Sequence, residues 1–160
     1  MADPRFFDNR GPFRLGELCA KAGLSCPDGS GDALVHDVAG LSQAGAQHLS
    51  FFEGMRARQD FQTTKAGWCL VKSTPSLRPL PPSTVLITAP TIARAFATIA
   101  STFYPDHELL LTLEGSVHPT ARLGDGVQIA STVAIGPGAG IGEKTRIAAG
   151  SQIARGVTIG

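Results

Sequence analysis

Histidine is the side chain best suited to proton transfer near neutral pH, because its unperturbed pKa is about 6.5. The chain carries four histidines, at positions 36, 48, 107 and 118. They form no cluster of the kind that ligates zinc, which counts against a metal-dependent hydration enzyme. We interpret His36 and His48 as residues of loops or strand edges and His118 as a corner residue, and we assign none of them a catalytic role.

The cysteines show no catalytic or metal-binding pattern either. Cys19, Cys26 and Cys69 are odd in number and lack metal-ligand spacing. We interpret them as reduced thiols of a cytoplasmic protein, with Cys19 on a helix face and Cys69 in a buried strand. Neither a metal nor a cofactor is expected.

Charge and hydropathy exclude further classes of protein. The formal net charge is +1 and the 14 Lys and Arg residues are scattered, so nucleic acid is not a favoured partner. The opening residues, MADPRFFDNRG, are too charged for a secretory signal. The longest apolar stretches are too short to span a bilayer, so no transmembrane segment is expected.

A glycine-rich string at 136–142 looks at first like a phosphate-binding loop, but it belongs to a longer internal repeat. From Val117 onward every sixth residue is aliphatic, and the register never slips. A lone aliphatic every six residues fits neither a helix nor a single strand, whereas a flat-sided coil of short strands and corners produces it. The eight positions are Val117, Leu123, Ile129, Ile135, Ile141, Ile147, Ile153 and Ile159.

Small residues accompany each aliphatic. Gly or Ala follows it in seven of the eight units, where we expect a sharp turn that excludes a large side chain. A small or β-branched residue stands two positions before it and is expected to share the narrow interior. Only stacking of successive coils buries such a ladder, so the unit is an array.

This repeat resembles that of the hexapeptide-repeat transferases, whose left-handed parallel β-helix uses three hexapeptides per coil. The resemblance implies about two and a half coils for residues 117–160. It is specific for fold but weak for function, because the same fold carries several transferase activities, γ-class carbonic anhydrases and non-catalytic proteins.

The residues before the repeat predict a small α/β domain. A short helix is expected at 16–23 and a polar helix within 53–66, and Pro90 is expected to open a third helix with one apolar stripe. Strands alternate with these helices. They are expected at 35–38, 49–52 (LSFF), 68–71 (WCLV) and 85–88.

Three sequence segments, in a fixed order, narrow the range of possible functions. They are VAGLSQAGAQHLSFFEGMRARQDFQTTKAGWCLV, VLITAPTIARAFATIASTFYP and VHPTARLGDGVQIA. Together they resemble the N-terminal part of the UDP-3-O-acylglucosamine N-acyltransferases, the third enzymes of lipid A synthesis in Gram-negative bacteria. The resemblance implies a uridine-binding α/β domain at 1–103, a connection at 104–116 and the start of a left-handed β-helix at 117–160.

The resemblance also implies a uridine pocket. In the family, a phrase like SFL-x-N-P-K-Y supplies an aromatic ring that stacks on uracil, followed by Asn and Tyr contacts. Phe51 falls on the stacking aromatic, whereas Gly54 replaces the Asn and Ala57 replaces the Tyr. From the strand pattern alone, Phe51 and Phe52 point to opposite faces, one into the core and one more exposed. Arg56 matches a basic family position and is expected to be exposed.

The implied reaction moves an (R)-3-hydroxyacyl chain from acyl carrier protein to the 2-amino group of UDP-3-O-acylglucosamine, in a cytoplasmic homotrimer. The resemblance implies that the catalytic His lies on a later coil of the β-helix. In this sequence the repeat stops mid-unit at Ile159-Gly160. We therefore expect an N-terminal fragment that truncates the β-helix, with the catalytic His and the carrier-protein contact beyond Gly160, and no acyl transfer by these residues alone.

Two alternatives remain open. One is another hexapeptide-repeat acyltransferase with an unrelated N-terminal domain. The other is a non-enzymatic scaffold built on the same β-helix. A histidine within later coils and a helical C-terminal tail would favour the lipid A enzyme, whereas failure to bind any UDP-sugar or acyl carrier protein would favour the scaffold.

Overall fold

The computed structural model describes residues 3–4, 7–73, 79–105 and 117–160. It divides into two compact units, one of Asn9–Tyr104 and one of Ala2–Asp8 with Pro105–Gly160. Each unit has its own hydrophobic core. No helix within the described ranges combines the length and the apolar character that a membrane crossing requires.

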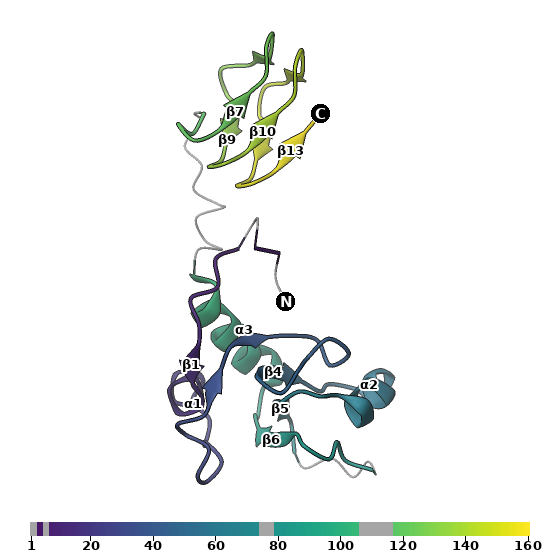
Figure 1. Cartoon of the computed structure of the whole chain (residues 1–160). Coiled ribbons are helices and arrows are strands. Elements are labelled where there is room, and N and C mark those ends of the chain that lie inside the picture. The colour runs from purple at the N-terminus through teal and green to yellow at the C-terminus, as the bar shows by residue number, and fades with distance from the viewer. Residues whose placement is uncertain (1–2, 5–6, 74–78, 106–116) are drawn as a thin grey trace. The chain divides into compact units, whose positions relative to one another are not determined.

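The first unit is built on a parallel sheet of four strands in the order β3-β4-β5-β6 (Figure 1). The strands are β3 (Asp37–Val38), β4 (His48–Phe51), β5 (Trp68–Val71) and β6 (Val85–Thr88). All four residues of β5 are buried. Full burial follows from cover on both faces of the sheet, as parallel sheets generally have.

Two helices cover one face of this sheet. They are α1 (Leu15–Ala22) and α3 (Ile92–Phe103), and their apolar stripes join Trp68 and Leu70 in one core cluster. The 3-10 helix η1 (Met55–Ala57) and helix α2 (Arg58–Thr63) follow β4, and Phe61 of α2 packs with Cys69 and Val71 on the other face. Strand alternation along β5 thus divides its side chains between two cores.

The expected helices are confirmed with shifted ends. Helix α1 ends at Gly23, whose φ of 67° lies in the left-handed region, and the N–H of Leu24 returns to the carbonyl of Cys19 at 2.8 Å. Gly23 is favoured at such a helix end because it lacks a Cβ. Pro90 does not occupy the first turn of α3 as expected, because Thr91 is the N-cap in an extended conformation.

The expected strand at 35–38 is two strands of different sheets. Strand β2 (Leu34–Val35) pairs antiparallel with β1 (Phe13–Arg14), whereas β3 pairs with β4. Strand β1 was not expected from the sequence, because two residues are too few to show a period.

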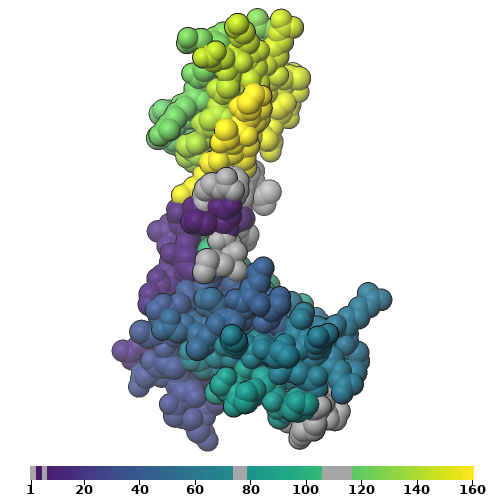
Figure 2. Space-filling view, turned by 45° about the vertical axis from the view of Figure 1, so that its right-hand side comes forward, coloured from purple at the N-terminus to yellow at the C-terminus, as the bar shows by residue number. Residues whose placement is uncertain are grey.

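The second unit consists of short strands that stack in parallel at an offset of 18 residues. Ile141 lies opposite both Leu123 and Ile159, Ile147 opposite Ile129, and Ile153 opposite Ile135. Figure 1 shows β7, β10 and β13 side by side, and in Figure 2 the colour of this unit passes from green to yellow. The strands are β7 (Arg122–Leu123), β8 (Gln128–Ile129), β9 (Ala134–Ile135), β10 (Gly140–Ile141), β11 (Arg146–Ile147), β12 (Gln152–Ile153) and β13 (Thr158–Ile159).

The aliphatic ladder forms the core of this unit, as the period predicts. Ile135 is fully buried, and Val133 and Ala139, which stand two positions before an aliphatic, are buried with it. Asp8 adds a contact from the start of the chain, since its carboxylate accepts hydrogen bonds from both terminal nitrogens of Arg155 at 2.6 and 2.8 Å. Both side chains are partly exposed, so this pair adds only modest stability.

Glycine is favoured at two kinds of position in the repeat, for two different reasons. A Cβ on Gly136, which follows an aliphatic, would lie 2.7 Å from the backbone nitrogen of Arg155 in the next coil. The left-handed corner stands two residues later, at Gly138 with φ 67°, and Lys144 with φ 58° occupies the same corner of the following hexapeptide. The expected exclusion of a large side chain directly after the aliphatic is confirmed, but crowding between coils causes it, and the turn stands at residues 137–138 instead.

Candidate functional site

A small cavity lies where two strands of the parallel sheet end. Its volume is about 190 Å³. Phe52, Glu53 and Gly54 follow β4, and Val71, Lys72 and Ser73 end and follow β5, with Ile92 at the start of α3 completing the wall. Ligands of open α/β sheets characteristically bind outside the carboxyl ends of the strands, which is this position.

Phe51 and Phe52 lie on opposite faces of the sheet, as strand alternation predicts. The ring of Phe51 packs on Phe96 of α3 with centroids 4.6 Å apart, and the ring of Phe52 stacks on Phe61 of α2 at 4.3 Å. Both rings are half-buried. The expected contrast between a core ring and a more exposed ring is wrong, because a helix covers each face. Phe52 lines the cavity, whereas Phe51 is not on its wall.

Gly54 and Ala57, which stand where the phrase SFL-x-N-P-K-Y has Asn and Tyr, belong to the segment that follows β4. Gly54 lines the cavity, and Ala57 is half-buried against the cluster that contains Phe61. Arg56 is exposed on η1. Lys72 brings an ammonium group and Glu53 a carboxylate to the rim, and both side chains are exposed. The wall thus combines apolar side chains with two exposed charged ones.

Gly54 has a backbone conformation that other residues avoid. Its φ of 82° and ψ of 155° fall in a region populated almost only by glycine. Nothing lies within 4 Å of the position that a Cβ would take. The glycine is therefore required by its dihedral angles and not by crowding, and an Asn cannot replace it without strain.

We expect Gly54→Asn to lower the free energy of unfolding by about 1 to 3 kcal/mol, the cost of holding a side-chain residue in this region. The measurement is chemical denaturation followed by the fluorescence of Trp68, the one tryptophan of the chain. Gly40→Asn is the matched control, since Gly40 is exposed, has no positive φ and has free space around its Cβ position. Equal stability of the two variants would show that Gly54 is not constrained.

Two of the three described histidines hold turns, and none of the three lines the cavity. His48 Nδ1 accepts the backbone N–H of Gly45 at 3.0 Å, and His118 Nδ1 accepts that of Thr120 at 3.2 Å. His36 is exposed between β2 and β3. His107 lies outside the described residues. The first two rings therefore each use Nδ1 in local structure.

Two of the cysteine thiols, those of Cys19 and Cys69, are buried and not reactive groups of a site. Burial raises the pKa of Cys69 to about 12. Burial, followed by the neighbouring Cys26, raises the pKa of Cys19 to about 12. Both thiols are protonated at neutral pH, which removes the nucleophilic form. In the part of the chain that the structure describes, no three His, Cys, Asp or Glu residues come together to hold a metal ion.

Sequence reasoning missed the part of the wall that β5 contributes. Val71, Lys72 and Ser73 lie beside Phe52 and Gly54 because β4 and β5 are adjacent parallel strands, with Phe51 opposite Leu70. The WCLV strand was expected, so the residues directly after it were the available signal. What the sequence did not show was that this strand neighbours LSFF.

The chain is similar to proteins of one family. Residues 32–102 match the family described as UDP-3-O-(3-hydroxymyristoyl) glucosamine N-acyltransferase, LpxD. A UDP-3-O-acylglucosamine N-acyltransferase from Bradyrhizobium sp. (strain ORS 278) is 34% identical over 136 residues, covering 79% of this chain and 38% of that protein. One from Parvibaculum lavamentivorans is 35% identical over 125 residues, covering 76% and 35%. The chain thus spans well under half the length of these curated relatives.

Proposed function

We propose a function from the premise that the chain belongs, through residues 32–102, to the family of UDP-3-O-acylglucosamine N-acyltransferases. In this proposal the chain supplies the part of such an enzyme that holds the UDP group of the acceptor sugar. The observation that carries it is the cavity at the carboxyl ends of β4 and β5, which lies within the matched region and borders the Phe51–Ala57 segment.

The proposed reaction belongs to lipid A biosynthesis. The 2-amino nitrogen of UDP-3-O-acylglucosamine attacks the thioester carbonyl of an (R)-3-hydroxyacyl group on acyl carrier protein. An amide bond forms, the carbon–sulfur bond breaks, and the carrier thiol leaves. The attacking amine must be neutral, so a general base is needed. We assign that base to none of His36, His48 and His118, because none lines the cavity, and propose that the acyl-transfer centre lies outside the described residues.

We propose that the Phe51–Ala57 segment, which begins at the last residue of β4, recognises uridine. Phe51 is the candidate stacking platform, with Gly54 and Ala57 at the neighbouring family positions. Aromatic stacking on a base is worth about 1 to 3 kcal/mol. Lys72 at the cavity mouth is the candidate partner of the diphosphate, since an ammonium group favours nearby phosphate oxygens.

For the second unit we propose a left-handed parallel β-helix, and for the whole enzyme a cytoplasmic homotrimer. The 18-residue offset between paired strands supports three hexapeptides per coil. The corresponding division of the chain is a uridine-binding α/β domain at 1–103, a connection at 104–116 and the β-helix at 117–160. Most of that connection lies outside the described residues.

Calorimetric titration of nucleotides into the chain tests the proposal. We expect UDP and UDP-glucosamine to bind and ADP to bind at least about tenfold more weakly, a difference of about 1.4 kcal/mol. Lys72→Met should weaken UDP more than uridine, because only UDP carries the phosphates. Lys144→Met, an exposed lysine of the repeat, is the control and should change neither. No heat with UDP, or equal affinity for UDP and ADP, would reject uridine recognition.

A further inference from the structure

Strand β6 forms a free edge of the parallel sheet. It pairs with β5 alone, and the N–H groups of Val85 and Ala89 donate to carbonyls on the β5 side at 2.9 and 2.8 Å. Successive residues of a strand direct their backbone groups to alternate sides, so Leu86 and Thr88 direct N–H and C=O away from β5. Within the described residues no hydrogen bond reaches these groups.

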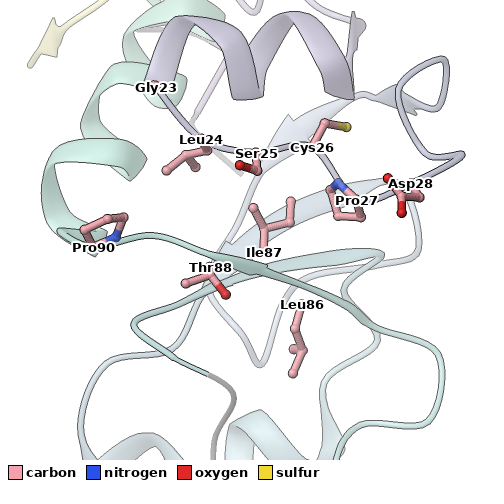
Figure 3. A pocket seen from close by; sticks show the side chains of 10 residues that line it. All are labelled: Gly23, Leu24, Ser25, Cys26, Pro27, Asp28, Leu86, Ile87, Thr88 and Pro90. Carbon is pink, nitrogen blue, oxygen red and sulfur yellow. The ribbon is translucent and has the colours of Figure 1, made fainter.

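A cavity of about 500 Å³ runs beside this edge. Its second wall is the loop that follows α1, from Gly23 to Asp28 (Figure 3). In Figure 3, Ile87 points toward the loop and Leu86 toward the opposite side of the strand, yet both residues line the cavity. A space lined by both faces of one strand lies along its edge, where the unpaired backbone groups are.

A second cavity, of about 380 Å³, continues from the first. The two share Gly23, Leu24 and Pro90 as lining residues, and the second extends to Lys21 and Arg94. Both cations are exposed. Among the residues that the structure describes, no carboxylate forms an ion pair with either of them. The two cavities therefore form one groove with a hydrogen-bonding side and a cationic end.

We propose that this groove binds an extended peptide that ends in a free carboxylate. The peptide pairs with Leu86 and Thr88 as a fifth parallel strand, and its terminal carboxylate meets Lys21 and Arg94. Strand addition to an exposed edge takes its affinity mainly from the backbone, and capture of a terminal carboxylate sets the register. The groove shares no lining residue with the cavity at Phe52, so this proposal is independent of the proposed function.

The charge and the direction of β6 select this occupant. Pro90 follows the carboxyl end of β6, and Arg94 lies on α3 just beyond it. A bound strand that places its own carboxylate there runs in the same direction as β6. Every strand of this sheet is parallel to its neighbour, so the added strand continues the existing pattern.

Fluorescence polarisation tests the carboxylate. The probes are two fluorescein-labelled pools of random pentapeptides, one with a free C-terminal carboxylate and one amidated, titrated with the full chain. We expect the amidated pool to bind at least about tenfold more weakly. The double variant Lys21→Gln, Arg94→Gln should remove most of this preference, whereas Arg58→Gln, an exposed cation of α2, should leave it unchanged. Equal affinity of the two pools, or no binding of either, overturns the proposal.

Two variants of Thr88 test the strand pairing. Thr88→Pro removes an N–H that points away from β5 and leaves the β5–β6 hydrogen bonds in place, a position where edge strands tolerate proline. It should weaken the free-carboxylate pool at least about tenfold. Thr88→Val keeps that N–H and should bind within about twofold of the wild type. Sedimentation is run in parallel, because a self-association that Thr88→Pro abolishes would show that a second copy covers the edge and would overturn peptide binding.

Discussion

Ile135→Ala should lower the free energy of unfolding of the repeat unit by about 2 to 5 kcal/mol, the usual cost of truncating a buried isoleucine. The Ile135 side chain is fully buried. It lies in the middle layer of the stack, because Val117 pairs with it on one side and Ile153 on the other. Removing it leaves a cavity between two layers that are held by backbone pairing and cannot close over the space.

Leu123→Ala is the matched control. Leu123 holds the same position in its hexapeptide but is 45% exposed, because no described strand stacks beyond β7. We expect a loss of less than about 1 kcal/mol there. Hydrogen exchange at the amides of Gly136 and Gly142 follows the repeat, and Trp68 fluorescence follows the first unit. Equal losses for the two variants would contradict the burial gradient along the ladder.

The aliphatic ladder could be predicted from the sequence because aliphatic residues recur at every sixth position without a break. The cause of its glycines could not. Gly136 is selected by the backbone of the next coil, and Gly138 by its own positive φ. Both pressures select the same residue type, so a linear pattern does not separate them. Lys144 shows the difference, since it adopts φ 58° at a corner where several other units have glycine.

Elements of the first unit were predictable in proportion to their length. Strands β5 and β6 have the predicted ends, because each is a short apolar run bounded by polar or turn-forming residues. The segment 35–38 was predicted as one strand, whereas Val35 and Asp37 pair with different partners. Pairing between residues distant in sequence determines that division, and two-residue strands carry no period that would reveal it.

The candidate site likewise contains residues that the sequence could identify and residues that it could not. Phe51, Gly54 and Ala57 lie in one continuous segment, so a sequence phrase can identify them. Lys72 reaches the cavity only because β5 lies beside β4. Helix α3 has a similar effect, since Phe96 covers the Phe51 ring and leaves Phe52 on the cavity wall. The segment was therefore predictable, whereas the choice of ring exposed to the cavity was not.

Phe51→Leu should weaken UDP-glucosamine binding by about 5- to 150-fold if the Phe51 ring stacks on uracil, which corresponds to the 1 to 3 kcal/mol of one base stack. Leucine retains most of the apolar volume against Phe96, so the variant removes the flat aromatic face while keeping the core filled. Calorimetric titration gives the affinity, and denaturation monitored by Trp68 fluorescence checks that the fold is intact.

Phe52→Leu is the control that separates the two rings. Phe52 is also half-buried and stacks on Phe61 on the other face of the sheet, so each variant removes one ring–ring contact. If Phe51 is the platform, Phe52→Leu should change the affinity by less than about threefold. If the cavity wall itself holds the base, the order reverses and Phe52→Leu shows the large loss. An unchanged affinity in Phe51→Leu rejects the stacking role of Phe51, and the reversed order transfers that role to Phe52.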